Sequence, residues 1–127
     1  MTLYENYAGA ASVWRWPNFS PKEIACHGTG SLLVNVPALN RLQLLRDLLN
    51  LPLTVFSAYR SPRHNALVGG APLSQHLLGT AFDLALVLPL REMREAAADV
   101  GFTGFGCYRT FIHIDIGPKR SWGPWIS

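Results

Sequence analysis

Hydrophobic residues along this chain recur with a helical period in some segments and alternate with polar residues in others. Between Pro37 and Asn50 the apolar positions lie three or four residues apart, which predicts an amphipathic helix with a stripe at Leu39, Leu42, Leu45 and Leu49. A second helix is predicted over Pro89 to Val100, with Gly101 as its C-cap. Ser20 and Glu23 have the spacing of a capping box, so a further helix is predicted with Ser20 as its N-cap and Pro21 in its first turn.

Two segments with alternating apolar residues, 82–88 and 110–116, are predicted to be strands. Successive side chains of a strand point to opposite faces. One face of segment 82–88 therefore carries a phenylalanine and three leucines, and one face of segment 110–116 carries three isoleucines. The other face carries Asp83 in the first strand, and His113 and Asp115 in the second. If the apolar faces pack on the helices, we expect Asp83 and His113 to project together from the opposite side.

The remaining elements complete a prediction of the fold class. Residues 53–59 are rich in β-branched and aromatic side chains and predict another strand, which ends at a polar turn over residues 60–65. The tail, residues 117–122, is predicted to be turn-like. Helices followed by interspersed strands and a helix indicate an α+β fold with a small, mainly antiparallel sheet packed on helices. The length predicts a single domain over residues 1–127.

Composition supports a folded domain and narrows its location. Hydrophobic residues make up 49% of the chain and charged residues 15%, which argues against disorder. No apolar run approaches the roughly 18 residues of a membrane span. The first residues lack the basic and apolar regions of a secretory signal, so we expect synthesis in the cytoplasm.

The net charge of +3 and the pI near 9.2 favour an anionic partner, such as nucleic acid or a cell-wall polymer. Basic residues are scattered rather than clustered with aromatics, so nucleic acid is the weaker interpretation and ordinary solubility the neutral one. Cys26 and Cys107 lack C-x-x-C spacing, and we expect two reduced thiols.

Three residues could form a metal site. His76 and Asp83 lie seven residues apart, and His113 follows thirty residues after Asp83. Two imidazoles and a carboxylate leave a fourth position open for water, which is typical of a catalytic zinc site. Taken singly, each residue is typical of a hydrogen-bonded side chain in a strand or turn. Only the combination of the three favours a metal site.

The chain also carries several motifs in a fixed order. They are Ser57-Ala58-Tyr59-Arg60-Ser61, Ser74-x-His76-x-x-Gly79-x-Ala81-x-Asp83, His113-x-Asp115 and Arg120-x-Trp122. Together, over residues 17–122, they resemble the zinc peptidases of bacterial cell walls. These include D-alanyl-D-alanine carboxypeptidases, L-alanyl-D-glutamate endopeptidases and many phage-encoded members, and they share the Hedgehog/DD-peptidase fold.

The resemblance implies a role for each matching residue. His76, Asp83 and His113 would hold one Zn²⁺ per chain. Arg60 would polarise the substrate carbonyl and stabilise the oxyanion, and it would therefore both bind substrate and act in catalysis. Ser74 would lie beside the site in a supporting, substrate-binding role.

The general base is where the chain departs from the resemblance. Thr110 stands where some branches carry a carboxylate, and Phe111 stands where another branch carries a histidine. Asp115, on the same strand face as His113, is the remaining candidate, either as the base or as a partner that orients a ligand. His64 is an alternative base or substrate contact.

The implied function is hydrolysis of a bond in the stem peptide of peptidoglycan, by a carboxypeptidase or an endopeptidase. Without a signal peptide, the enzyme would reach the cell wall by phage-mediated release, by lysis or as part of a virion, which makes phage lysis or virion proteins candidate partners. The alternative is a non-catalytic zinc domain of the same fold that binds the wall or serves in a virion.

Overall fold

A five-stranded sheet forms the centre of the structure, a computed structural model that describes residues 1–125. Across the sheet the strands are β3 (Val55–Ser57), β4 (Ala81–Ala85), β6 (Phe111–Asp115), β5 (Gly104–Cys107) and β7 (Arg120–Trp122). Neighbouring strands are antiparallel except β5 and β7, which run parallel. The predicted α+β class with a mainly antiparallel sheet is confirmed.

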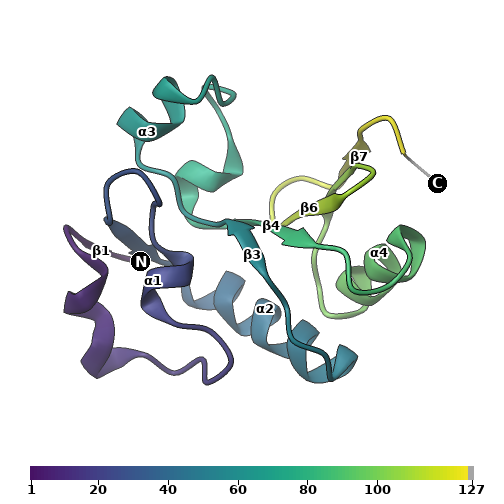
Figure 1. Cartoon of the computed structure of the whole chain (residues 1–127), viewed down its shortest axis with the longest axis horizontal. Helices are drawn as coiled ribbons and strands as arrows, with labels where there is room; N and C mark the ends of the chain where they lie inside the picture. The colour runs from purple at the N-terminus through teal and green to yellow at the C-terminus, as the bar shows by residue number, and fades with distance from the viewer. Residues whose placement is uncertain (126–127) are drawn as a thin grey trace.

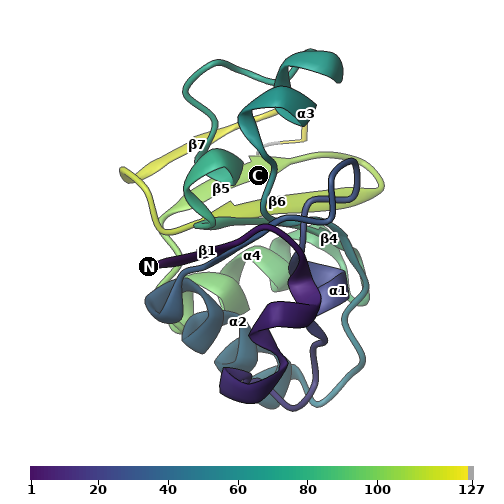
Figure 2. The same ribbon diagram turned by 90° about the vertical axis from the view of Figure 1, so that its left-hand side faces the viewer.

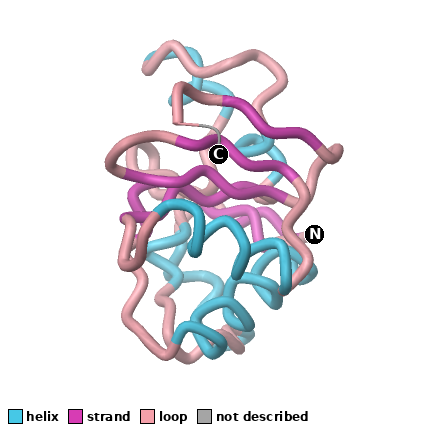
Figure 3. Tube along the Cα trace, turned by 90° about the vertical axis from the view of Figure 1, so that its right-hand side faces the viewer, coloured by secondary structure: helices cyan, strands magenta, loops and turns pink. Residues whose placement is uncertain are grey.

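Two helices, α2 (Val36–Leu49) and α4 (Leu90–Asp99), pack on one face of this sheet (Figures 2 and 3). The predicted leucine stripe lies on the inner side of α2, where three of its four members are buried: Leu39, Leu42 and Leu45. They pack in one core with the side chains on the helix-facing side of β4 and β6, namely Phe82, Leu84, Ile112 and Ile114. Each such fully buried side chain contributes about 1.5–3 kcal/mol. Within residues 1–125, no helix is both long enough and apolar enough to cross a bilayer.

The N-terminal part of the chain forms a smaller unit beside α2 (Figure 1). It consists of β1 (Thr2–Tyr4), the 3-10 helix η1 (Tyr7–Val13), α1 (Pro21–Ile24) and β2 (Leu32–Val34), with β1 and β2 antiparallel. The capping box predicted at the start of α1 is present. The Ser20 hydroxyl accepts the backbone N–H of Glu23 at 3.2 Å, and the Glu23 carboxylate accepts that of Ser20 at 2.9 Å.

The predicted polar turn over residues 60–65 is wrong, because helix α3 (Pro62–Leu67) occupies most of it. Ser61 is its N-cap, with its hydroxyl accepting the N–H of His64 at 3.2 Å, and Pro62 suits its first turn. A helix of six residues is too short to show a hydrophobic period. Helix α3 lies on the side of the sheet opposite α2 and α4 (Figure 2).

The predicted turn-like tail is also wrong in part. Arg120 to Trp122 form strand β7, and neither β7 nor β5 shows the alternation that predicts a strand. Two of the four residues of β5 are glycines, which have low strand propensity, so only pairing with neighbouring strands fixes this segment. The strands predicted over 53–59 and 82–88 are shorter than expected, at Val55–Ser57 and Ala81–Ala85.

Candidate metal centre

His76 is carried by a short 3-10 helix, η2 (Gln75–Leu78), that precedes β4. Ser74 caps this helix, with its hydroxyl accepting the N–H of His76 at 3.2 Å. Gly79 ends it in the left-handed conformation, with φ of 69°. A side chain at Gly79 would lie 3.0 Å from the carbonyl oxygen of Leu33, so glycine is required both for the turn and for the close approach.

The backbone just after β3 holds the His76 side chain in place. His76 is 2% exposed, and its Nδ1 lies 2.6 Å from the carbonyl oxygen of Ala58. The backbone N–H of Arg60 donates to the carbonyl of His76 at 3.1 Å. Because a carbonyl can only accept, Nδ1 must carry the proton and donate it. The Nε2 atom is therefore the nitrogen left for a metal.

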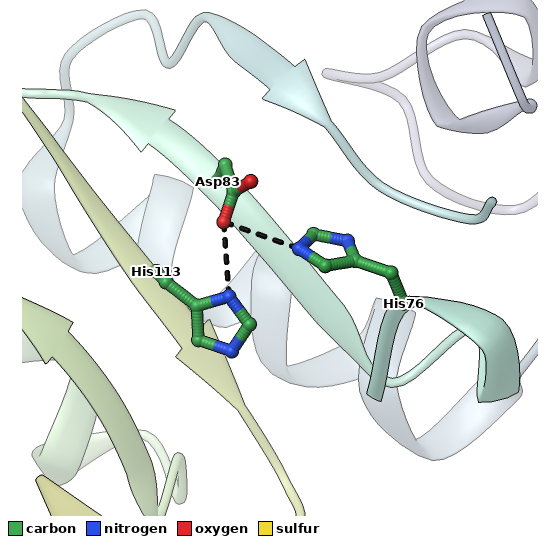
Figure 4. Close-up of side chains that lie close together, drawn as sticks. All are labelled: His76, Asp83 and His113. Carbon is green, nitrogen blue, oxygen red and sulfur yellow. Dashed lines mark hydrogen bonds and ion pairs between the residues drawn. The ribbon is translucent and has the colours of Figure 1, made fainter. Parts of the chain in front are cut away.

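Asp83 and His113 project from the same side of the sheet, as predicted, and the register of the β4–β6 ladder places them directly opposite each other. Asp83 Oδ1 is 3.0 Å from His113 Nδ1 and 3.2 Å from His76 Nε2, so two imidazoles converge on one carboxylate oxygen (Figure 4). One candidate ligand atom from each of the three residues lies within 4.8 Å of the others. The structure thus brings together the three predicted ligands.

The chemistry of these atoms fits a bound cation. His76 Nε2 is buried and makes no hydrogen bond to any part of residues 1–125, although it is 3.2 Å from Asp83 Oδ1. In a neutral ring that nitrogen and the carboxylate oxygen are both acceptors, and a buried acceptor without a donor is unfavourable. A metal ion shared by both atoms removes this conflict, and a His-Asp-His donor set with a free position suits zinc.

Charge in the centre is arranged around Asp83. Burial alone would raise the pKa of Asp83, but the hydrogen bond from His113 and the nearby imidazole of His76 outweigh it and hold the pKa well below its ordinary value. Burial would lower the pKa of His113, but hydrogen bonds to Asp115 and Asp83 outweigh that effect and raise it. Without a metal, His113 is thus a proton-binding site between two carboxylates.

Arg60 also reaches the centre, as the sequence predicts. Its guanidinium lies 3.6 Å from Asp83 Oδ2. Arg60 Nε donates to the Ser57 hydroxyl at 3.3 Å, and its NH1 group donates to the Asn65 side-chain oxygen at 3.0 Å. A Cβ atom at Gly70 would overlap the Asn65 carboxamide, so the loop after α3 packs closely around this arginine. A fixed cation therefore stands beside the candidate metal ligands.

These residues open onto a cleft of about 390 Å³. Its lining includes the three candidate ligands together with Arg60, Ala71, Leu73, Ser74, Gln75, Tyr108, Phe111, Arg120 and Trp122. Ser74 is thus beside the site, where its supporting role is predicted. His64 is not part of this lining, and its ring instead packs against the backbone of Gly28.

Asp115 has a different setting from the one a general base needs. Its side chain is fully buried and does not line the cleft. Burial would raise the pKa of Asp115, but hydrogen bonds from His113, Arg120 and Gly117 outweigh it and lower the pKa below its ordinary value. Arg120, five residues after Asp115, belongs to the Arg120-x-Trp122 motif, but the family resemblance implies no role for it. Ala58 and Asn65 lie in segments that match the family pattern, but their contacts with His76 and Arg60 depend on loop conformation and could not be predicted from the sequence.

Comparison with known proteins agrees with this geometry. The Peptidase M15 family model matches residues 17–115, and the chain belongs to this family of metal-dependent peptidases. The predicted family resemblance is confirmed. Among curated proteins, the chain is 36% identical over 81 residues to the probable peptidoglycan L,D-endopeptidase MepK of Haemophilus influenzae. The match covers 58% of this chain and 44% of that protein, so the chain spans less than half of its relative.

Proposed function

We propose that this protein is a zinc-dependent peptidase that hydrolyses a bond in the stem peptide of bacterial peptidoglycan. The observation that carries the proposal is the convergence of His76 Nε2 and His113 Nδ1 on Asp83 Oδ1, with a buried nitrogen that no hydrogen bond satisfies. Membership of the M15 peptidases supports the reaction class. The name of the Haemophilus relative, a probable peptidoglycan L,D-endopeptidase, supports the substrate and favours an endopeptidase over a carboxypeptidase.

In this proposal the metal is held by His76, Asp83 and His113. A zinc ion bound there supplies Lewis-acid chemistry for the hydrolysis of an amide. The β4–β6 ladder fixes Asp83 and His113, and the bonds to Ala58 and Arg60 fix His76. The chain therefore supplies a preorganised site that needs little rearrangement when the ion binds.

Arg60 is the residue placed to act on the substrate. Its guanidinium borders the cleft next to the metal ligands, and Ser57 and Asn65 restrict its orientation. A donor aimed at the oxygen of the scissile carbonyl stabilises the negative charge that develops there during hydrolysis. We assign this role to Arg60.

The contacts of Asp115 support an orienting role rather than that of general base. Both of its carboxylate oxygens are engaged by donors from the protein, and neither faces the cleft. A base must come within hydrogen-bond reach of the proton that it removes. Among the described residues that line the cleft, Asp83 is the only carboxylate.

The test is digestion of purified peptidoglycan by the metal-replete protein, with mass spectrometry of the released fragments. We expect a defined fragment whose mass identifies the bond, and no fragment from chelator-treated protein or from the His76→Ala variant. One bound zinc per chain with no product would support the non-catalytic wall-binding alternative. Failure to bind any divalent ion would overturn the metal centre. Action at the cell wall follows from the substrate, while the phage context and phage partners stay predictions from the sequence.

A further inference from the structure

On the Nε2 side of His113, the buried carboxylate of Asp115 forms an ion pair with Arg120, whose side chain is 37% exposed and borders the cleft. We propose that Arg120 is a positioning residue of the metal centre: it fixes Asp115, which in turn fixes the Nε2 edge of His113 so that Nδ1 faces His76 and Asp83. The inference rests on the proposed function, because it concerns the ligand geometry of that same centre.

The contacts of Asp115 form a closed set. Asp115 Oδ2 lies 2.6 Å from His113 Nε2, and the side chain of Asp115 is 0% exposed. The guanidinium of Arg120 donates to both carboxylate oxygens, at 2.9 and 2.8 Å, and the N–H of Gly117 donates to Oδ1 at 2.9 Å. With every acceptor occupied, the carboxylate has one orientation, and so does the ring that donates to it.

Strand β7 brings Arg120 to this position. In the sheet, Gly104 of β5 pairs with both Asp115 and Arg120, on its two sides. A Cβ atom at Gly104 would overlap both the Asp115 carboxylate and the Arg120 guanidinium. The glycine therefore leaves the space in which the two side chains meet across β5.

Trp122 packs against both His113 and Arg120. Its ring lies 4.9 Å from the His113 ring, and the Arg120 guanidinium lies 4.8 Å from the Trp122 ring centre. The indole N–H of Trp122 donates to the Tyr108 hydroxyl at 2.9 Å, which anchors the indole. Arg120 is thus held between a carboxylate and an aromatic face, an arrangement that needs the planar fork of arginine.

The Asp115–Arg120 pair is expected to contribute little to the free energy of unfolding. The carboxylate of Asp115 is fully buried, and the free energy needed to remove it from water offsets much of its attraction to the partly exposed Arg120. The benefit of the pair is geometric: a His113 ring that donates Nε2–H to Asp115 offers Nδ1 to the metal. Loss of a partner that orients a metal ligand typically weakens metal binding by about 10- to 100-fold.

The first measurement is zinc affinity by chelator competition in the wild type and in the Arg120→Ala, Arg120→Lys and Arg109→Ala variants. Arg109 is the matched control, because it is an exposed arginine at the turn between β5 and β6. We expect roughly 10- to 100-fold weaker binding for Arg120→Ala, a smaller loss for Arg120→Lys and no change for Arg109→Ala. Millimolar guanidinium, which can enter the space left by the side chain, should restore zinc affinity in Arg120→Ala alone.

The second measurement is the ¹H–¹⁵N spectrum of the His113 ring, which a role in folding alone would not change. We expect a slowly exchanging Nε2 proton in the metal-free and zinc-loaded wild type, and its loss or rapid exchange in Arg120→Ala. If Arg120→Ala does not fold, the same comparison is made with Arg120→Lys. Unchanged zinc affinity and an unchanged Nε2 signal in a folded variant would overturn the positioning role while leaving the proposed function intact. A wild type that binds no zinc but needs Arg120 for the Nε2 signal would overturn the metal centre instead.

Discussion

The two histidines of the candidate centre are held in different ways. His76 donates to a backbone carbonyl, that of Ala58, in the segment that follows β3, with helix α3 between the two residues in the chain. His113 faces the buried carboxylate of Asp115, which depends on Arg120 from a strand beyond the neighbouring one. A backbone carbonyl cannot be removed by substitution, whereas a side-chain network can. We therefore expect zinc affinity to tolerate mutation of side chains near His76 and to be sensitive to mutation of side chains near His113.

The largest effect in this comparison should come from Arg60→Ala, on the His76 side. The backbone N–H of Arg60 still bonds to His76 in that variant, so zinc content should not change. Loss of an oxyanion donor should lower kcat/KM by roughly 100- to 1000-fold. Turnover of a peptidoglycan fragment and zinc content are measured together, with the exposed Arg63→Ala in α3 as the control. Unchanged turnover would refute the role of Arg60.

The Asp115→Asn variant tests how far zinc binding by His113 depends on the side chain that orients it. We expect zinc binding about 10- to 100-fold weaker, with activity largely recovered at saturating zinc, because the variant loses the carboxylate that orients His113. Chelator competition and turnover at high zinc measure the two effects separately, and Asp99→Asn on the exposed side of α4 is the control. Full zinc affinity with a large loss of turnover would instead identify Asp115 as the general base.

The pH dependence of the metal-free protein sharpens the comparison further. The pKa of His113 is raised above its ordinary value of 6.5, so its stabilising effect is complete below pH 6.5 and is lost as pH rises through the folded-state pKa. The pKa values of Asp83 and Asp115 are lowered from 3.8, so their effect is present above pH 3.8 and is lost as pH falls through the folded-state values. Thermal unfolding in chelator should show maximum stability between these limits.

Bound zinc should abolish the loss of stability at high pH. Metal binding requires an unprotonated Nδ1 of His113, so it becomes stronger as pH rises and that nitrogen loses its proton. The same unfolding series with zinc provides that comparison, and His113→Gln should flatten the alkaline decline. A metal-free protein that loses no stability above pH 6.5 would contradict the charged setting of His113.

The smallest effect should come from Ser74→Ala, again on the His76 side. This variant loses the N-cap of η2, which costs about 0.5–2 kcal/mol of the free energy of unfolding. Zinc affinity should change less than in Asp115→Asn, because the backbone bonds to Ala58 and Arg60 remain. Urea unfolding and chelator competition test both statements. A loss of zinc affinity as large as that of Asp115→Asn would break the proposed difference between the two sides.

Several features of this structure follow from local sequence. The leucine spacing between Pro37 and Asn50 predicts α2 to within one residue at each end, and the Ser20–Glu23 spacing predicts the start of α1. The alternation in two segments predicts that Asp83 and His113 lie on the polar faces of their strands, although only strand pairing brings them opposite each other. Each of these signals arises from neighbours within a few residues, where helix and strand periods act directly.

Other features depend on partners that are distant in sequence. Strand β7 forms because β5 pairs with it, and β5 in turn forms because β6 pairs with it. The burial of Asp115 follows from that pairing, which is why the strand pattern alone left its role open between base and orienting partner. Helix α3 is too short to give a period, and the anchoring of Arg60 by Asn65 depends on the helix and the loop that follows it.

The sequence by itself determined the α+β class, the main helices and the set of three candidate ligands, because hydrophobic periodicity and motif spacing are local properties of the chain. Only the tertiary structure decided which nitrogen of each histidine faces the centre, and that Asp115 is enclosed by Arg120 rather than open to the cleft. The physical reason is that the orientation of a polar side chain is set by the donors and acceptors around it. In this protein those groups come from strands and loops that meet only when the sheet has formed.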